Sequence, residues 1–209
     1  MSYIDLYTII TCFIFGLVMG SFFNVVGYRL PKGESILTPP SQCPKCKHKL
    51  TPFELIPIFS FIIQKGRCKN CKEKISLFYP FFEFFTGICF SLSYIKFGIS
   101  IDFLIAITLI SMLLIIIISD YLYLIIPDEI LIICTILLII ELYIKNGIIA
   151  LGWSIVDGII AFLLMFLLKK LGDFLFKKES MGGGDIKLLF ILGMVFKWEN
   201  ALLIIFLAS

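Results

Sequence analysis

Two kinds of residue in this sequence could do chemistry: aspartates beside long apolar runs, and cysteines in closely spaced pairs. Asp120 ends an isoleucine-rich run, and Asp185 begins another run directly after three glycines. An acid is costly to bury in lipid, so an acid at such a position usually has a function. Two carboxylates placed close together share one proton. One then activates water while the other polarises a peptide carbonyl, which is aspartyl protease chemistry.

The glycines before Asp185 support this interpretation. A peptide must be extended to be cut, and Gly182 and Gly184 leave no side chain in its way and permit unusual φ values. The alternative is that Asp185 merely caps the helix that follows. Asp128 comes directly after Pro127 and before an apolar run, so its expected role is that of a helix N-cap.

The cysteine pairs predict a metal site. Cys43-x-x-Cys46 and Cys68-x-x-Cys71 are separated by 21 residues, which is typical of a tetrahedral four-cysteine zinc site. A pair of disulfides is the alternative, and a reducing cytoplasm disfavours it. No coordination position is left open, so the zinc is expected to fold the loop rather than to catalyse. His48, the only histidine, is expected to be a neighbour and not a ligand.

The elements that must position these residues are transmembrane helices. Hydrophobic residues make up 60% of the 209 residues and charged ones 16%, against roughly 25% charged in soluble domains. We therefore expect an all-α polytopic membrane protein, a bundle of about 6–8 transmembrane segments with a cytoplasmic zinc-binding loop. Apolar runs of spanning length or nearly so cover residues 4–26, 77–94, 103–119, 130–144 and 148–168.

Two further runs begin at Ile186 and near Ala201. The last is too short to cross a bilayer, since a span needs about 20 residues, and the chain is expected to be incomplete at its C-terminus. Within residues 4–26, Gly16 and Gly20 form a small-residue stripe that predicts close helix packing.

The basic residues predict the topology. Residues 27–76 hold ten Lys and Arg and residues 169–187 hold five, while only three lie elsewhere. Under the positive-inside rule, the 27–76 loop, the 120–129 turn and the 169–185 loop are all cytoplasmic. Both Asp120 and Asp185 would then act at the cytoplasmic face.

These stretches together carry a resemblance to a known family. Gly182-x-Gly184-Asp185 resembles the GxGD motif of intramembrane aspartyl proteases, and the chain as a whole resembles the bacterial type IV prepilin peptidases. The similar stretches are GLVMGSFFNVVGYRLP, both CxxC pairs, GRCKNC, YPFFE, SDYLYLIIPD and GGGDIKLL, in the order of the family. They extend over nearly the whole chain.

The resemblance implies two activities in the bacterial cytoplasmic (inner) membrane. Such enzymes cut the short basic leader from prepilins and pseudopilins, and then methylate the new N-terminus with S-adenosylmethionine. The catalytic pair corresponds to Asp120 and Asp185. Residues 1–76 would be the anchor helix with a methyltransferase-associated zinc loop, and residues 77–209 the peptidase domain. Membrane lipid is an expected partner and nucleic acid is not.

The methyl-donor site rests on the resemblance alone, which points to the region of Gly66 and Arg67. No glycine-rich turn between a strand and a helix supports it. Asn24 and Arg29 could contact substrate or headgroups, or only pack, and Glu83 is either functional or part of an ion pair. Two other classes stay open: another GxGD protease, and a transporter or proton relay that uses the two aspartates as titrating groups.

Overall fold

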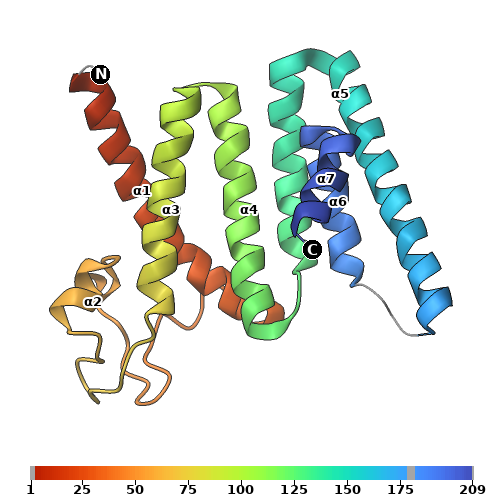
Figure 1. The fold of residues 1–209 in the computed structure, drawn as a ribbon. Coiled ribbons are helices and arrows are strands. Elements are labelled where there is room, and N and C mark those ends of the chain that lie inside the picture. The colour runs from red at the N-terminus through yellow and green to blue at the C-terminus, as the bar shows by residue number, and fades with distance from the viewer. Residues whose placement is uncertain (1–2, 178–181, 209) are drawn as a thin grey trace. The chain divides into compact units, whose positions relative to one another are not determined.

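The computed structural model describes residues 3–177 and 182–208. This part of the chain is built from helices and turns, with two isolated β-bridges, so the all-α prediction is confirmed (Figure 1). It forms two compact units, Met1–Leu124 and Ile125–Ser209. Residues 178–181, which belong to the 169–185 loop predicted to be cytoplasmic, lie outside the described residues.

The first unit contains α1 (Tyr3–Arg29), α3 (Phe78–Phe97) and α4 (Ile101–Tyr123). The long connection from α1 to α3 holds η1 (Leu30–Lys32), η2 (Pro52–Leu55) and α2 (Phe59–Ile63). The second unit contains α5 (Asp128–Phe176), α6 (Gly183–Phe196) and α7 (Trp198–Ala208).

Four helical stretches are long and apolar enough to cross a membrane: Tyr3–Lys32, Phe78–Phe97, Ile101–Tyr123 and Asp128–Leu175. They contain the five longest apolar runs predicted as spans, because α5 includes both residues 130–144 and residues 148–168. The helices α6 and α7 have only 14 and 11 residues, fewer than the roughly 20 that a perpendicular span needs. The chain is therefore a polytopic membrane protein, and the described residues contain four helical stretches that could span, one of which, α5, includes two of the predicted runs.

In the first unit, α1 packs on α3 through small residues. A Cβ atom at Gly16 would lie 2.7 Å from the Gly87 Cα atom, and one at Gly20 would lie 2.8 Å from the Glu83 Cα atom. Both distances are far below van der Waals contact. Helices in lipid associate through such close backbone packing, because apolar burial gives them little driving force there. The small-residue stripe that the sequence predicted is confirmed.

In the second unit, α5 is a helical hairpin (Figure 1). Its helical geometry is broken at Gly147, where φ is 77° and ψ is 177°, a conformation that strains any residue with a side chain. α6 packs against the second half of α5 as closely as α1 packs on α3, since a Cβ atom at Gly193 would lie 2.7 Å from the Ala161 Cβ atom. The core cluster is Ala161, Met165, Ile186, Leu189, Leu192 and Ala201.

Candidate functional site

The four cysteines predicted as ligands form one cluster. Their sulfur atoms all lie within 4.8 Å of one another. The Cys43 and Cys71 sulfurs are 3.8 Å apart, and those of Cys46 and Cys68 are 3.9 Å apart. A tetrahedral zinc ion with bonds of about 2.3 Å to sulfur separates its ligands by about 3.8 Å. A disulfide needs about 2.05 Å, so the disulfide alternative is wrong and the cluster can bind a metal ion.

Two tight turns of the same construction present these thiols. In the first turn, the Cys43 N–H donates to the His48 carbonyl (2.9 Å), and the Lys47 N–H donates to the Cys43 carbonyl (3.0 Å). Lys47 has a φ of 58°. The second turn repeats both hydrogen bonds and the positive φ at Cys68, Lys72 and Glu73. Each pair of cysteines is therefore presented by the hydrogen bonds of its own turn.

The electrostatics of the cluster favour a cation. The backbone N–H of His48 lowers the pKa of Cys46 to about 6, and the N–H groups of Cys46 and Lys45 lower the pKa of Cys43. At Cys71, the backbone N–H of Glu73 lowers the pKa. Burial and the neighbouring thiols raise it by more, so that the pKa is about 11. The neighbouring thiols thus oppose ionisation of Cys71, and a divalent cation would remove that repulsion.

Residues around the cluster hold it together. The Asn70 side chain donates to the Cys46 sulfur (3.6 Å), and Lys45 and Glu73 form an ion pair that joins the two turns. His48 contacts Glu54 through its Nε2 atom (3.3 Å), so it is a neighbour of the cluster, as expected.

The backbone of Gly66 and Arg67 is part of the second turn. Gly66 donates its N–H to the Phe61 carbonyl and accepts from the Ile75 N–H, each at 2.8 Å. The Arg67 N–H donates to the Gln64 carbonyl (3.1 Å). These amides are engaged in the fold and so provide no cradle for a nucleotide.

Asp120 lies in the last turn of α4 with an exposed side chain. Aromatic contacts hold this turn on both sides. Tyr121 stacks on Phe78 of α3 with ring centroids 5.2 Å apart, and Tyr123 meets Tyr28 of α1 at 6.0 Å. The helix end that carries Asp120 is therefore anchored to both neighbouring helices of its unit.

Asp185 lies in the first turn of α6 and is half-buried. Gly182 is the N-cap, with a φ of −65° and a ψ of 148°. No glycine from Gly182 to Gly184 has a left-handed φ, so the expectation of unusual φ values is wrong. The requirement is steric: a Cβ atom at Gly184 would lie 2.7 Å from the Ile126 Cβ atom, and one at Gly182 would lie 3.2 Å from the Asp185 Oδ2 atom.

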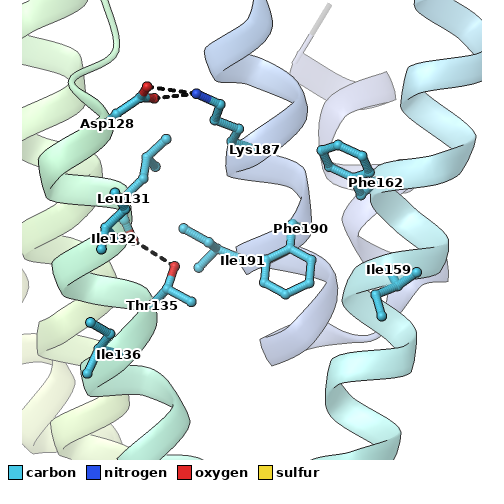
Figure 2. Close-up of a pocket in the computed structure, with 10 residues that line it drawn as sticks. All are labelled: Asp128, Leu131, Ile132, Thr135, Ile136, Ile159, Phe162, Lys187, Phe190 and Ile191. Carbon is cyan, nitrogen blue, oxygen red and sulfur yellow. Dashed lines mark hydrogen bonds and ion pairs between the residues drawn. The ribbon is translucent and has the colours of Figure 1, made fainter.

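Asp128 has a different role from the one predicted. Pro127 is the N-cap of α5, without a side-chain cap, and Asp128 is the first helical residue. Both of its carboxylate oxygens accept from the Lys187 Nζ atom at 2.7 Å (Figure 2). The pair joins the start of α5 to the start of α6, two residues beyond Asp185. Sequence reasoning missed Lys187, because nothing in the GGGDIK stretch indicates a partner 59 residues away.

An apolar groove of about 550 Å³ begins at this ion pair and runs between α6 and the two halves of α5. Figure 2 shows its lining, which is apolar apart from Asp128, Thr135 and Lys187. The Thr135 hydroxyl is used within α5, where it donates to the Leu131 carbonyl (2.6 Å). The groove can hold an apolar chain, and its only charged groups are at the Asp128 end.

The three residues whose roles stayed open in the sequence all make specific contacts in the first unit. Asn24 is 4% exposed, and its side-chain NH₂ donates to a backbone carbonyl of α3 (3.2 Å). Glu83 is 8% exposed and accepts from the backbone N–H of Ile58 (2.8 Å). Arg29 donates to the Ser35 carbonyl (3.1 Å). These side chains join the helices to one another and to the cysteine loop.

Comparison with known proteins shows similarity to one family over most of the chain. The model of the bacterial peptidase A24 N-terminal domain matches residues 14–97, and that of the type IV leader peptidase family matches residues 107–209. A prepilin leader peptidase/N-methyltransferase of Bacillus subtilis is 38% identical over 185 residues, which are 88% of this chain and 71% of that protein. No solved structure matches significantly.

Two further relatives have the same name. The one from Myxococcus xanthus is 32% identical over 94% of this chain and 58% of its own length. The one from Klebsiella pneumoniae is 31% identical over 94% of this chain and 89% of its own length. The chain therefore belongs to the type IV leader peptidase family.

Proposed function

We propose that this chain is a prepilin peptidase of the bacterial inner membrane. It cleaves the short basic leader from prepilins and pseudopilins and N-methylates the new N-terminal residue. Family membership supports the activity, and the location of both motif aspartates supports the mechanism. Asp120 is in the last turn of one apolar helix and Asp185 in the first turn of another, where charged groups and lipid-embedded substrate can meet.

In the proposed cleavage step, Asp120 and Asp185 act as a pair that shares one proton. The ionised carboxylate takes a proton from water, which attacks the scissile carbonyl, while the protonated carboxyl donates a hydrogen bond to that carbonyl oxygen. Collapse of the tetrahedral intermediate breaks the C–N bond, and the departing amine takes up the proton that the carboxylate had removed from water. The clustered basic residues of the 27–76 and 169–187 stretches support a cytoplasmic location for this chemistry.

Zinc is proposed as a structural ion in the four-cysteine cluster. The sulfur spacing fits it, and four protein ligands leave no position for water or substrate. Cys43, Cys46, Cys68 and Cys71 would hold it. Zinc would supply a fixed link between two turns that are otherwise joined by the Lys45–Glu73 ion pair.

S-adenosylmethionine is the proposed methyl donor, which supplies an electrophilic methyl group for the N-terminal amine. The backbone N–H groups of Gly66 and Arg67 are engaged in the fold, so the proposed contribution of these two residues to a donor site is the Arg67 side chain.

The test is a two-part assay on the purified chain in lipid. A prepilin and a labelled methyl donor are added, and leader release and label transfer are followed separately. Asp120→Asn and Asp185→Asn should each stop leader release. A transporter or proton relay would leave the prepilin uncut even in the unsubstituted chain, and that result would refute the proposal.

A further inference from the structure

The stretch between the two cysteine turns, residues 52–63, has the composition of a membrane element although it lies within the most basic loop of the chain. Its sequence, PFELIPIFSFII, contains one charged residue. Six of its apolar side chains are exposed: Phe53, Leu55, Ile56, Phe59, Ile62 and Ile63. The exposed fractions of Phe53 and Ile63 reach 81% and 78%. A water-soluble loop rarely exposes so much contiguous apolar surface.

The single charge of the segment is turned inward. The Glu54 side chain is only 6% exposed. Its Oε2 atom accepts from the backbone N–H and the hydroxyl of Thr51, each at 2.9 Å, and also contacts His48. The single charged side chain of the 52–63 segment is therefore withdrawn from its outer surface.

The segment lies beside the spanning helices and not beyond their ends. The Ile58 N–H donates to the Glu83 carboxylate at 2.8 Å. Glu83 is five residues inside α3, which begins at Phe78, and so about 7–8 Å along its axis. Figure 1 shows α2 next to the lower part of α3. The segment also faces α1, because Leu55, Ile56 and Pro57 line one groove with Val18, Ser21 and Phe22.

Backbone chemistry explains why Glu83 is at this depth. Irregular backbone survives in lipid only where its polar groups are satisfied by protein. Ile58 has a φ of 61° and precedes the short helix α2, so its N–H has no partner within a helix. The Glu83 carboxylate supplies that partner. Positions 52 and 57 are proline, which has no backbone N–H, so two fewer N–H groups need a hydrogen-bond partner.

We propose that residues 52–63 insert into the lipid leaflet next to the zinc loop, as a re-entrant element anchored by Glu83. The partner is the bilayer itself, with anionic headgroups at the edge of the inserted part. Residues 27–76 hold ten basic and three acidic residues, so the flanking turns are attracted to such headgroups. The distance of Glu83 from the start of α3 is comparable to the roughly 5–10 Å to which interfacial helices enter a membrane. The zinc cluster is thereby held at the membrane surface.

Tryptophan quenching in vesicles tests this insertion. The full chain carries Trp153→Phe and Trp198→Phe, and single tryptophans are introduced as Phe59→Trp, Ile63→Trp or, as the matched control, Lys69→Trp in the second cysteine turn. Vesicles contain phosphatidylcholine and phosphatidylglycerol, with or without a nitroxide on the acyl chain close to the glycerol. Acrylamide serves as the quencher in water.

Phe59→Trp and Ile63→Trp should lose fluorescence with the nitroxide lipid and resist acrylamide, and Lys69→Trp should show the opposite pattern. Equal acrylamide quenching of Ile63→Trp and Lys69→Trp would overturn the proposal.

A second set of variants tests the anchor. Glu83→Ala should make the tryptophan of Phe59→Trp more accessible to acrylamide, whereas Glu83→Gln should not, because its amide oxygen still accepts from Ile58. Unchanged zinc content would confirm that the cysteine loop is folded in each variant. Identical quenching in Glu83→Ala and Glu83→Gln would contradict the anchoring role of Glu83.

Discussion

At the scale of single residues, the two aspartates carry the proposed cleavage chemistry, and each is supported differently. Asp120 belongs to a turn held by aromatic rings, while Asp185 follows glycines that let α6 start directly against Ile126. Substitution of either acid would remove the proposed pair, because every step of the proposed mechanism needs one ionised and one protonated carboxyl.

Asp120→Asn and Asp185→Asn should therefore each abolish cleavage while leaving methylation of an already processed substrate intact. The double variant should be no worse than either single variant, since residues that act as a unit are not additive. Leader release measured by gel shift checks the first part, and label transfer to a synthetic N-terminus checks the second. Robust cleavage by Asp120→Asn would show that a different acid is paired with Asp185.

The glycines offer a matched pair of substitutions. Gly184→Val should abolish or strongly reduce cleavage, because a side chain at position 184 collides with Ile126 and displaces the turn that carries Asp185. Gly183→Ala should be tolerated, since among the described residues no atom outside its own turn lies within 4 Å of the place that a Cβ atom would occupy there, and alanine favours a helix over glycine by about 0.5–1 kcal/mol. Equal losses in the two variants would refute the steric explanation.

At the scale of elements, two contacts between segments position the sites: the Asp128–Lys187 pair between α5 and α6, and the paired cysteine turns. The ion pair is half-exposed and the cysteine turns are compact. Loss of the ion pair should therefore destabilise the fold much less than loss of the cysteine cluster.

The Asp128–Lys187 pair should contribute little to stability. The two side chains are 56% and 51% exposed, and exposed pairs contribute about 0.2–1 kcal/mol. Asp128→Asn and Lys187→Met should each retain most cleavage activity, and a double-mutant cycle on thermal unfolding should give a coupling energy in that range. Complete loss of activity in Asp128→Asn, with folding intact, would place Asp128 in the catalytic machinery instead.

The cysteine cluster should bind about one zinc ion per chain, as four-cysteine sites do. Cys43→Ser combined with Cys46→Ser should remove the metal, unfold the loop and reduce methylation more than cleavage. Cys12→Ser, in α1 and away from the cluster, is the control and should keep its zinc. Elemental analysis together with the two activity assays gives the answer. Unchanged zinc content in the double variant would mean that the ligands are misassigned.

At the scale of the whole molecule, the distribution of basic residues predicts which ends of the helices face the cytoplasm. Asn146, beside the bend of α5, and Lys177, at the end of α5, are both exposed. They should lie on opposite sides of the membrane.

A thiol reagent that cannot cross membranes should label Asn146→Cys in intact cells. Lys177→Cys should react, above the signal of the unsubstituted chain, only after permeabilisation. The reverse pattern would put both aspartates on the outer face and exclude the proposed mechanism.

The sequence by itself determined which apolar runs become the longer helices and that the four cysteines form one ligand set. It also indicated Asp120, Asp185 and the glycines before Asp185 as the candidate catalytic residues. These are local patterns, in which composition and spacing over a few residues are sufficient. Only the tertiary structure decided that Glu83 accepts from Ile58, that Asp128 pairs with Lys187 instead of capping α5, and that Gly184 is needed for space. These contacts join residues 25 to 59 positions apart, and such pairings depend on how helices pack, which short-range patterns do not encode.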